Sequence, residues 1–215
     1  MLRASSIAAA LMLALLSGCA EGPSAAPTDA PAVEAGAGVG DEAAPATAAA
    51  SDNVFVPPEF EPPVRVETAE FTVVPLGPEL VTIDYEAYMA SIEHLQKTFT
   101  RSTGWPREGI TDADAMQDML NEQQRFQNRE SFAYAVLTAD GTRERGCVYV
   151  SPSDRGDYDA VVRLWVTQAE YDAGFDAELY AWVQAWVAST WPFANVAYPG
   201  RAVSWAQWDA LAPPA

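Results

Sequence analysis

The stretch Ala160-Val-Val-Arg-Leu-Trp-Val166 decides the fold class of this chain of 215 residues. Its β-branched and aromatic side chains favour a strand, and its nearly unbroken apolar run is typical of a strand buried inside a sheet. Apolar residues then follow at i, i+3, i+4, i+7 and i+8 from Leu179, on one face of a helix that ends before Pro192. Residues 194–198 predict a second strand. This part of the chain therefore reads strand, helix, strand.

The region upstream of this unit predicts two helices. Apolar side chains spaced by three and four residues between Tyr85 and Phe99 indicate one amphipathic helix. Thr111 and Asp114 have the spacing of a capping box and predict the start of a second. The helices follow a short strand at residues 71–74.

A hairpin is predicted between the second helix and Ala160. Residues 132–136 and 147–150 alternate or are β-prone, and Asp140-Gly141 is a turn signal between them. Ser204 with Gln207 predicts a capped last helix. The order β-α-α-β-β-β-α-β-α favours an α/β (α+β) domain with one mixed sheet flanked by helices.

The N-terminus has the pattern of a secretory signal. Arg3 provides a positive charge, and residues 7–16 form an apolar run that is shorter than the ~20 residues needed to span a bilayer. The run ends in Leu16-Ser-Gly-Cys19, which resembles the lipobox of bacterial lipoproteins. This resemblance implies a signal peptide at residues 1–18, palmitate-type lipidation of Cys19, and an extracytoplasmic protein anchored to the cell membrane by lipid. The alternatives are an ordinary secretory signal, or a start codon further downstream and a cytosolic domain.

Residues 19–63 are predicted to be a disordered acidic tether. They are rich in Ala and Pro, and residues 20–53 have no aromatic or basic side chain, so they cannot bury enough apolar surface to fold. All seven Trp residues lie after this segment, and residues 64–215 are expected to form one globular domain.

The charge composition limits the partners. With 12 Lys and Arg against 30 Asp and Glu, the formal net charge is −18, which disfavours nucleic acid as a partner. The chain has one His and two Cys, so neither a disulfide within the mature chain nor a zinc site is expected. Expected partners are the membrane, through the N-terminal lipid, and an envelope protein or small ligand.

The element order from about residue 64 to residue 200 resembles the GNAT acetyltransferase superfamily. Residues 132–137, 146–150 and 161–166 are similar to the three central strands of small GNAT-like proteins. The resemblance implies that acetyl-CoA or another acyl-CoA enters a gap where two parallel strands splay apart. It further implies that Leu164, Trp165 and Val166 line the gap, and that Gly174 lies at the helix start that holds the pyrophosphate.

The phosphate loop departs from the family pattern at two positions. Tyr171 stands where Gln or Arg is usual, and Asp176 stands where Gly or Ala is usual. Acids crowd this helix start, and no Lys or Arg occurs between Arg163 and Arg201. The GNAT sheet is also expected to be shortened at its C-terminal end, without the family's Tyr acid, so no catalytic residue is assigned.

Two functions therefore remain open. One is a GNAT-type N-acyltransferase with a degraded phosphate loop, and the other is a non-catalytic ligand-binding or protein-interaction module of the cell envelope. Acetyl-CoA is cytosolic, so the expected location favours the second. Cys147 is interpreted as a buried strand residue rather than a nucleophile, and His94 as a boundary residue of its helix. The acidic loop at residues 154–159 is read as an ordinary turn.

Overall fold

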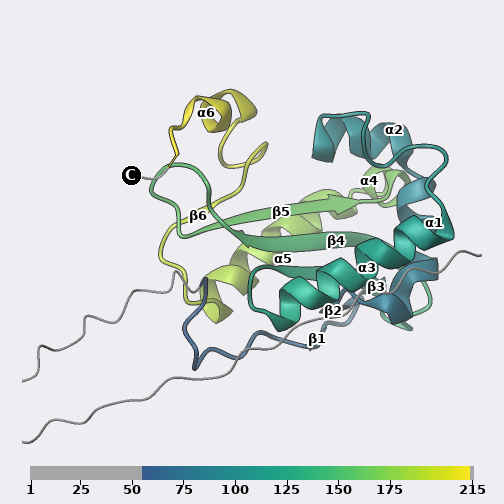
Figure 1. The fold of residues 1–215 in the computed structure, drawn as a ribbon, viewed down its shortest axis with the longest axis horizontal. Helices are drawn as coiled ribbons and strands as arrows, with labels where there is room; N and C mark the ends of the chain where they lie inside the picture. The colour runs from purple at the N-terminus through teal and green to yellow at the C-terminus, as the bar shows by residue number, and fades with distance from the viewer. Residues whose placement is uncertain (1–54, 214–215) are drawn as a thin grey trace, which may run out of the picture. The chain divides into compact units, whose positions relative to one another are not determined.

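The computed structural model describes residues 55–213, which form a single mixed sheet with helices on both faces (Figure 1). The predicted fold class, a mixed sheet flanked by helices, is confirmed. The strands, in chain order, are β1 (Val66–Glu67), β2 (Phe71–Pro75), β3 (Phe132–Thr138), β4 (Glu144–Pro152), β5 (Ala160–Val166) and β6 (Val196–Ala197). The helices are η1 (Pro78–Leu80), α1 (Val81–Met89), α2 (Ile92–Leu95), η2 (Gln96–Thr100), α3 (Asp112–Gln127), α4 (Gln168–Asp172), α5 (Phe175–Thr190) and α6 (Trp205–Ala210).

The strands lie in sequence order from β1 to β6, and only the last pair is parallel. Side chains alternate across the sheet as its pleat requires. Phe132, Tyr134 and Val136 pack with α5 on one face, whereas Ala133 and Ala135 pack with α1 and α3 on the other. Figure 1 shows α1 and α3 on one side of the sheet and α5 on the other. Two buried cores result, one on each face.

Both predicted capping boxes are present. The Thr111 hydroxyl accepts a hydrogen bond from the amide of Asp114 at the start of α3, and Ser204 accepts one from Gln207 at the start of α6. Each cap satisfies amide groups that the first turn of a helix leaves without a partner.

The predicted single helix around Tyr85–Phe99 is interrupted. Ser91 leaves helical geometry with φ −135° between α1 and α2, and the chain continues into the π-helix η2. The Ser91 hydroxyl instead accepts a hydrogen bond from the amide of Gln168. This hydrogen bond links the break between α1 and α2 to the first residue of α4.

The packed part of the chain begins before the predicted boundary at Val64. Val56 is fully buried in the α5 core, and Phe55 stacks between Phe132 and Phe193. Arg129 donates hydrogen bonds to the backbone carbonyls of the same segment. The Pro-rich composition concealed these apolar anchors. The tether prediction is therefore wrong for residues 55–63, and its remainder lies outside the described residues, as do the signal peptide and Cys19.

A β-bulge interrupts the β3–β4 hairpin. Val136 pairs with Gly146 and Leu137 with Glu144, so Arg145 has no opposite residue. A bulge of this kind turns the following side chains to the other face of the sheet. Gly146 is required here, because a Cβ at this position would lie 2.1 Å from the Trp165 carbonyl oxygen.

Candidate functional site: a cationic cleft beside an acidic hollow

The parallel strands β5 and β6 are joined over a very short length. Ala160 pairs with Val196 and Val161 with Ala197, and β6 then ends. Leu164–Val166 pair with β4 on one edge of β5. Along the other edge, which faces β6, they have no strand partner among the described residues. A strand edge without a partner presents free backbone donors and acceptors to a ligand.

A hollow of about 300 Å³ lies at this divergence, and we refer to it as the β5–β6 cleft. Its walls come from η2, β5, the α4–α5 region and the loop before α6. The lining residues are His94, Lys97, Thr98, Phe99, Arg163, Leu164, Trp165, Val166, Tyr171, Asp176, Pro199, Gly200, Arg201 and Trp205. The structure thus places Leu164, Trp165 and Val166 in the wall of a hollow. Their role in cofactor binding stays a prediction.

Positive charge gathers at the β5–β6 cleft, although the chain as a whole is strongly acidic. Lys97, Arg163 and Arg201 line it, and Asp176 is the one acid among the lining residues. Thus three of the 12 Lys and Arg residues meet one of the 30 Asp and Glu residues. The π-helix η2 contributes Lys97, the only Lys of the chain, together with Thr98 and Phe99. A cleft of this charge attracts anions.

Gly174 is the N-cap of α5 and is not itself among the residues that line the cleft. Its φ of 88° belongs to the left-handed region that favours glycine, and no side chain caps the helix. The first amide groups of α5 are therefore without a side-chain acceptor, at the positive end of a 16-residue helix. Such a helix start is suited to an anion.

Asp176 lies on the first turn of α5 and is paired rather than free. Arg201 donates from Nη1 to Oδ2 at 3.0 Å and from Nη2 to Oδ1 at 2.7 Å. The sequence suggested that acids alone crowd this helix start, because no basic residue lies nearby in the chain. The loop after β6 corrects that picture by bringing Arg201 to it.

His94 and Tyr171 both line the β5–β6 cleft, and their ring centroids lie 4.9 Å apart. Burial lowers the pKa of His94, and the charge of Asp176 and a hydrogen bond to the backbone of Val166 oppose this effect. His94 was expected to be a boundary residue of its helix, and the structure adds that it lines the cleft.

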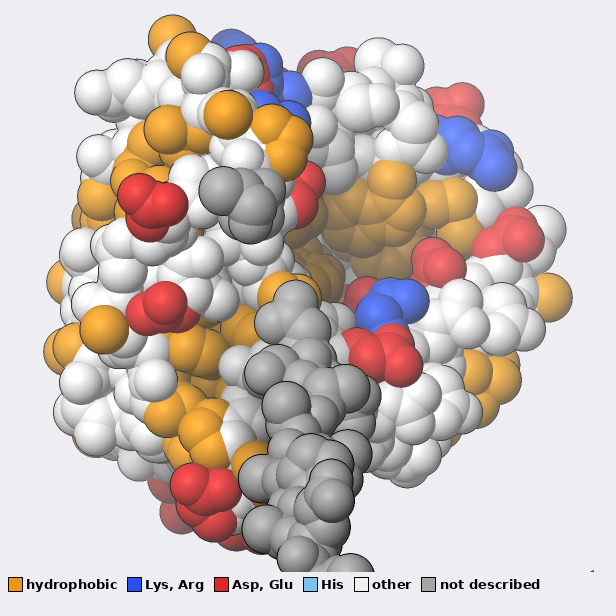
Figure 2. Space-filling view, turned by 60° about the vertical axis from the view of Figure 1, so that its left-hand side comes forward, with side chains coloured by type: hydrophobic (Ala, Val, Ile, Leu, Met, Phe, Trp, Pro, Cys, Tyr) orange, Lys and Arg blue, Asp and Glu red, His pale blue; other side chains and the backbone are white. Residues whose placement is uncertain are grey.

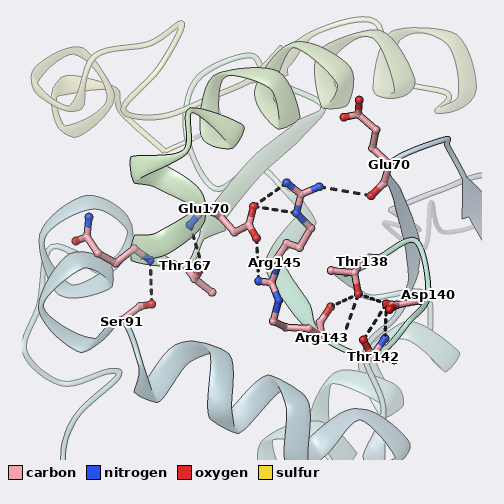
Figure 3. A network of polar contacts seen from close by, with 10 residues as sticks. Glu70, Ser91, Thr138, Asp140, Thr142, Arg143, Arg145, Thr167 and Glu170 are labelled. Carbon is pink, nitrogen blue, oxygen red and sulfur yellow. Dashed lines mark hydrogen bonds and ion pairs between the residues drawn. The ribbon is translucent and has the colours of Figure 1, made fainter.

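A partly buried network of polar contacts around Glu170 supports the α4–α5 side of the cleft (Figure 3). Glu170 of α4 accepts two hydrogen bonds from Arg145, at 2.9 and 2.7 Å, and pairs with Arg143 at 2.8 Å. Burial alone would raise the pKa of Glu170, but the two guanidinium groups outweigh it and lower the pKa. The Arg145 guanidinium also lies 3.4 Å from the ring centroid of Phe175, the first residue of α5. The network therefore fixes the start of α5.

A second hollow of about 370 Å³ adjoins the cleft and shares Phe99 and Arg163 with it; we refer to it as the acidic hollow. Aromatic and acidic side chains dominate its walls. Its other lining residues are Leu76, Asp84, Tyr88, Trp105, Ala115, Asp118, Met119, Glu122, Tyr149 and Ser151. The face in Figure 2 is hollowed, with hydrophobic side chains on the floor and charged side chains at the rim.

The acidic hollow has the chemistry of a cation site. The rings of Tyr88 and Trp105 lie 5.2 Å apart, and aromatic faces attract cations. The Tyr88 hydroxyl is buried without a hydrogen-bond partner. Burial, followed by the charge of Asp84, raises the pKa of Tyr88, so the hydroxyl is a neutral donor. No sequence pattern indicates this hollow, because its residues come from five separate helices and strands and from two loops.

Comparisons with known proteins add a likeness of fold. No protein-family model and no curated protein sequence matches the chain. Among solved structures, the ribosomal-protein-S5-alanine acetyltransferase from Vibrio fischeri is 15% identical, with a TM-score of 0.47 over 58% of this chain and 67% of that one. A putative ribosomal-protein-serine acetyltransferase from Vibrio cholerae is 12% identical, with a TM-score of 0.47 over 59% and 68%.

A third similar structure is the microcin C7 self-immunity acetyltransferase MccE, solved in complex with acetyl-CoA and AMP. It is 15% identical, with a TM-score of 0.43 over 60% of this chain and 69% of that one. At these identities the likeness concerns the fold alone.

Among the residues that the structure describes, no helix combines the length and the apolar character needed to cross a membrane.

Proposed function

We propose that the domain is a GNAT-like N-acyltransferase that binds an acyl-CoA in the β5–β6 cleft. The observation that carries the proposal is the divergence of the parallel strands β5 and β6 around a cation-lined hollow. The unpaired edge of β5 offers backbone groups to the amides of pantetheine. The uncapped start of α5, with Lys97 and Arg201, offers donors and positive charge to the phosphates.

The residues fit this ligand in charge, with one opposing group. Asp176 lies where phosphates would approach, and two unit charges ~6 Å apart repel by ~3 kcal/mol at an effective dielectric of ~20. Arg201 neutralises most of this charge through its two hydrogen bonds. An incoming phosphate would then share Arg201 with Asp176, so affinity is expected to be lower than a loop with Gly or Ala would give.

The acceptor of the acyl group is placed in the acidic hollow. Its carboxylates and aromatic rings attract an ammonium group, and the hollow meets the cleft at Phe99 and Arg163. In the transfer, a carboxylate of the hollow first takes one proton from the bound ammonium group. The resulting amine nitrogen forms a bond to the acyl carbon, the carbon–sulfur bond breaks, and CoA leaves as a thiolate that takes the second proton of the nitrogen.

An acyl-transfer assay tests this function. Full-length protein in mild detergent is mixed with acetyl-CoA and a set of primary amines and short peptides, and released CoA thiol is measured. Amine-dependent release above the rate of hydrolysis is expected. If CoA binds but no amine stimulates release, the domain is instead a binding module.

The alternative function, a non-catalytic binding or interaction module, is supported by the Asp176–Arg201 pair. The pair partly fills the anion position with groups of the chain itself, which suits a smaller anionic ligand better than a dinucleotide-sized one. A sheet that ends in the two-residue strand β6 also leaves an edge for a partner strand.

We also propose that the chain is a lipoprotein anchored through Cys19 to the extracytoplasmic side of the cell membrane. The lipobox-like sequence Leu16-Ser-Gly-Cys19 supports this. Labelling of cells with radioactive palmitate is expected to mark the wild-type protein and not Cys19→Ala. Equal labelling of both would contradict the anchor.

A further inference from the structure

Three ionisable side chains that the cleft does not use meet inside the core. They are Asp84 of α1, with 5% of its surface exposed, and Glu144 and Cys147 of β4, with 1% and 0%. One potential ligand atom from each lies within 4.8 Å of those of the other two. Ionisable groups are rarely buried without a charged partner, so their convergence requires a physical explanation.

The bulge at Arg145 brings the two strand residues together. Residues three apart on a regular strand point to opposite faces of the sheet. Because Arg145 has no opposite residue, Glu144 lies on the same face as Cys147, and its Oε1 is 2.9 Å from the thiol sulfur. Asp84 Oδ1 lies 3.7 Å from the same sulfur. The bulge in the hairpin therefore directs the side chains of both Glu144 and Cys147 toward α1.

The chain leaves this cluster without enough hydrogen bonds. Glu144 Oε2 is buried and has no partner. The neighbouring guanidinium groups, Arg143 and Arg145, are engaged by Glu170. Two carboxyl groups and a thiol are all acidic, so each supplies an acceptor when it ionises and none supplies a positive charge. A cation at this point would satisfy all three.

The cluster also borders open space on two sides. Asp84 lines the acidic hollow, and Glu144 lines a separate hollow of about 250 Å³ between α1 and the turn before β4. An ion and a coordinated water molecule therefore have room to approach. A soft thiolate with two hard carboxylates suits a borderline divalent ion and disfavours Mg²⁺ and Ca²⁺, which prefer oxygen ligands.

We propose that Asp84, Glu144 and Cys147 form a binding site for one divalent ion of the zinc type, with the remaining position open to water. The site shares no residue with the β5–β6 cleft, but Asp84 also lines the acidic hollow in which the acyl acceptor is proposed to bind. It was not foreseen from the sequence, where a single His and scattered Cys residues argued against zinc, because two ligands are aligned by a bulge and the third lies 60 residues upstream of Glu144.

Cobalt titration provides the test, because a thiolate bound to Co²⁺ gives a charge-transfer absorption band. Full-length Cys19→Ala protein in detergent, with Cys147 as its one thiol, is stripped with a chelator and titrated with Co²⁺ and then Zn²⁺. The expected result is a band that saturates at one Co²⁺ per chain and disappears when Zn²⁺ displaces it. Absence of the band at millimolar Co²⁺ would overturn the site and leave a carboxyl pair that shares a proton.

Variants assign the ligands. Adding Cys147→Ser should abolish the band, and adding Glu144→Gln should weaken Co²⁺ binding at least tenfold. Asp118→Asn is the matched control, because Asp118 lines the acidic hollow but does not belong to the cluster. It should leave the absorption band and the Co²⁺ affinity unchanged. A band that persists after Cys147→Ser would also overturn the proposal. If a variant does not fold, the titration of the Cys19→Ala protein still decides.

Discussion

Arg201, in the loop that follows β6, donates two hydrogen bonds, of 3.0 and 2.7 Å, to the carboxylate of Asp176 on the first turn of α5. The two residues are separated by 25 positions in the chain and come together at the β5–β6 cleft. The pair combines a negative carboxylate, which repels a phosphate, with a positive guanidinium, which attracts one. The balance between the two sets the affinity of the cleft for an anion.

Removal of the Asp176 carboxylate should strengthen anion binding. In Asp176→Ala, Arg201 is released to the ligand and a repulsive charge is lost, so the affinity for CoA should rise about tenfold, equivalent to ~1.4 kcal/mol. Isothermal titration calorimetry measures the change. Glu178→Ala is the matched control, because this exposed acid lies on the same turn but not in the cleft. An unchanged or weaker affinity in Asp176→Ala would contradict the proposed anion position.

The buried contact between Glu170 and Arg145 should matter for stability. Glu170→Gln removes the carboxylate from the largely buried Arg145 and from the exposed Arg143, and the free energy of unfolding should fall by ~2 kcal/mol. Because the folded protein lowers the pKa of Glu170, its contribution is present above the unfolded pKa and is lost as pH falls through the folded pKa. Urea unfolding at neutral and acidic pH measures both effects. The exposed Glu178→Gln should change stability by less than ~0.5 kcal/mol.

In metal-free protein, Asp84 should make stability depend on pH in the opposite direction to Glu170. Burial raises its pKa from 3.8 to about 7, so the folded state keeps a proton that the unfolded state releases. Stability should therefore fall as pH rises from about 4 to 7. Chemical unfolding across this range should show a decline that Asp84→Asn reduces. An identical pH profile in the variant would show that Asp84 does not hold the proton.

Gly146 should tolerate no side chain. A Cβ would lie 2.1 Å from the Trp165 carbonyl oxygen, a backbone atom that cannot move without shifting β5. Gly146→Ala should cost about 3 kcal/mol or more of stability. Gly104→Ala is the control, because its Cβ would meet only the Ser102 hydroxyl, at 3.3 Å. Thermal unfolding of the two variants should differ clearly, and equal melting temperatures would contradict the observed packing.

The regular elements were largely predictable because their signals are local. The strand at Ala160–Val166 was predicted with the bounds that the structure shows, since a buried strand needs only a β-prone apolar run. The capping boxes at Thr111 and Ser204 were recognised because a cap involves residues three apart. The role of Leu164–Val166 in binding an acyl-CoA was implied only by the GNAT resemblance, and it stays a prediction.

The features that give the site its chemistry are not local. No pattern near Asp176 indicates that Arg201 reaches it, because the loop after β6 makes that contact through tertiary structure. The π-helix that presents Lys97 and the bulge at Arg145 are departures from regular geometry, which periodicity cannot reveal. For the same reason, the sequence alone suggested a more acidic cleft than the folded chain has.

A calorimetric titration of CoA into the full-length protein tests the central claim, which is that the β5–β6 cleft binds the phosphates of an acyl-CoA. The account predicts saturable binding with one CoA per chain. It also predicts at least tenfold weaker binding in the double variant Asp176→Ala/Arg201→Ala than in Asp176→Ala alone, because the comparison isolates Arg201. Absence of binding at millimolar CoA, or equal affinity in the two variants, would contradict it.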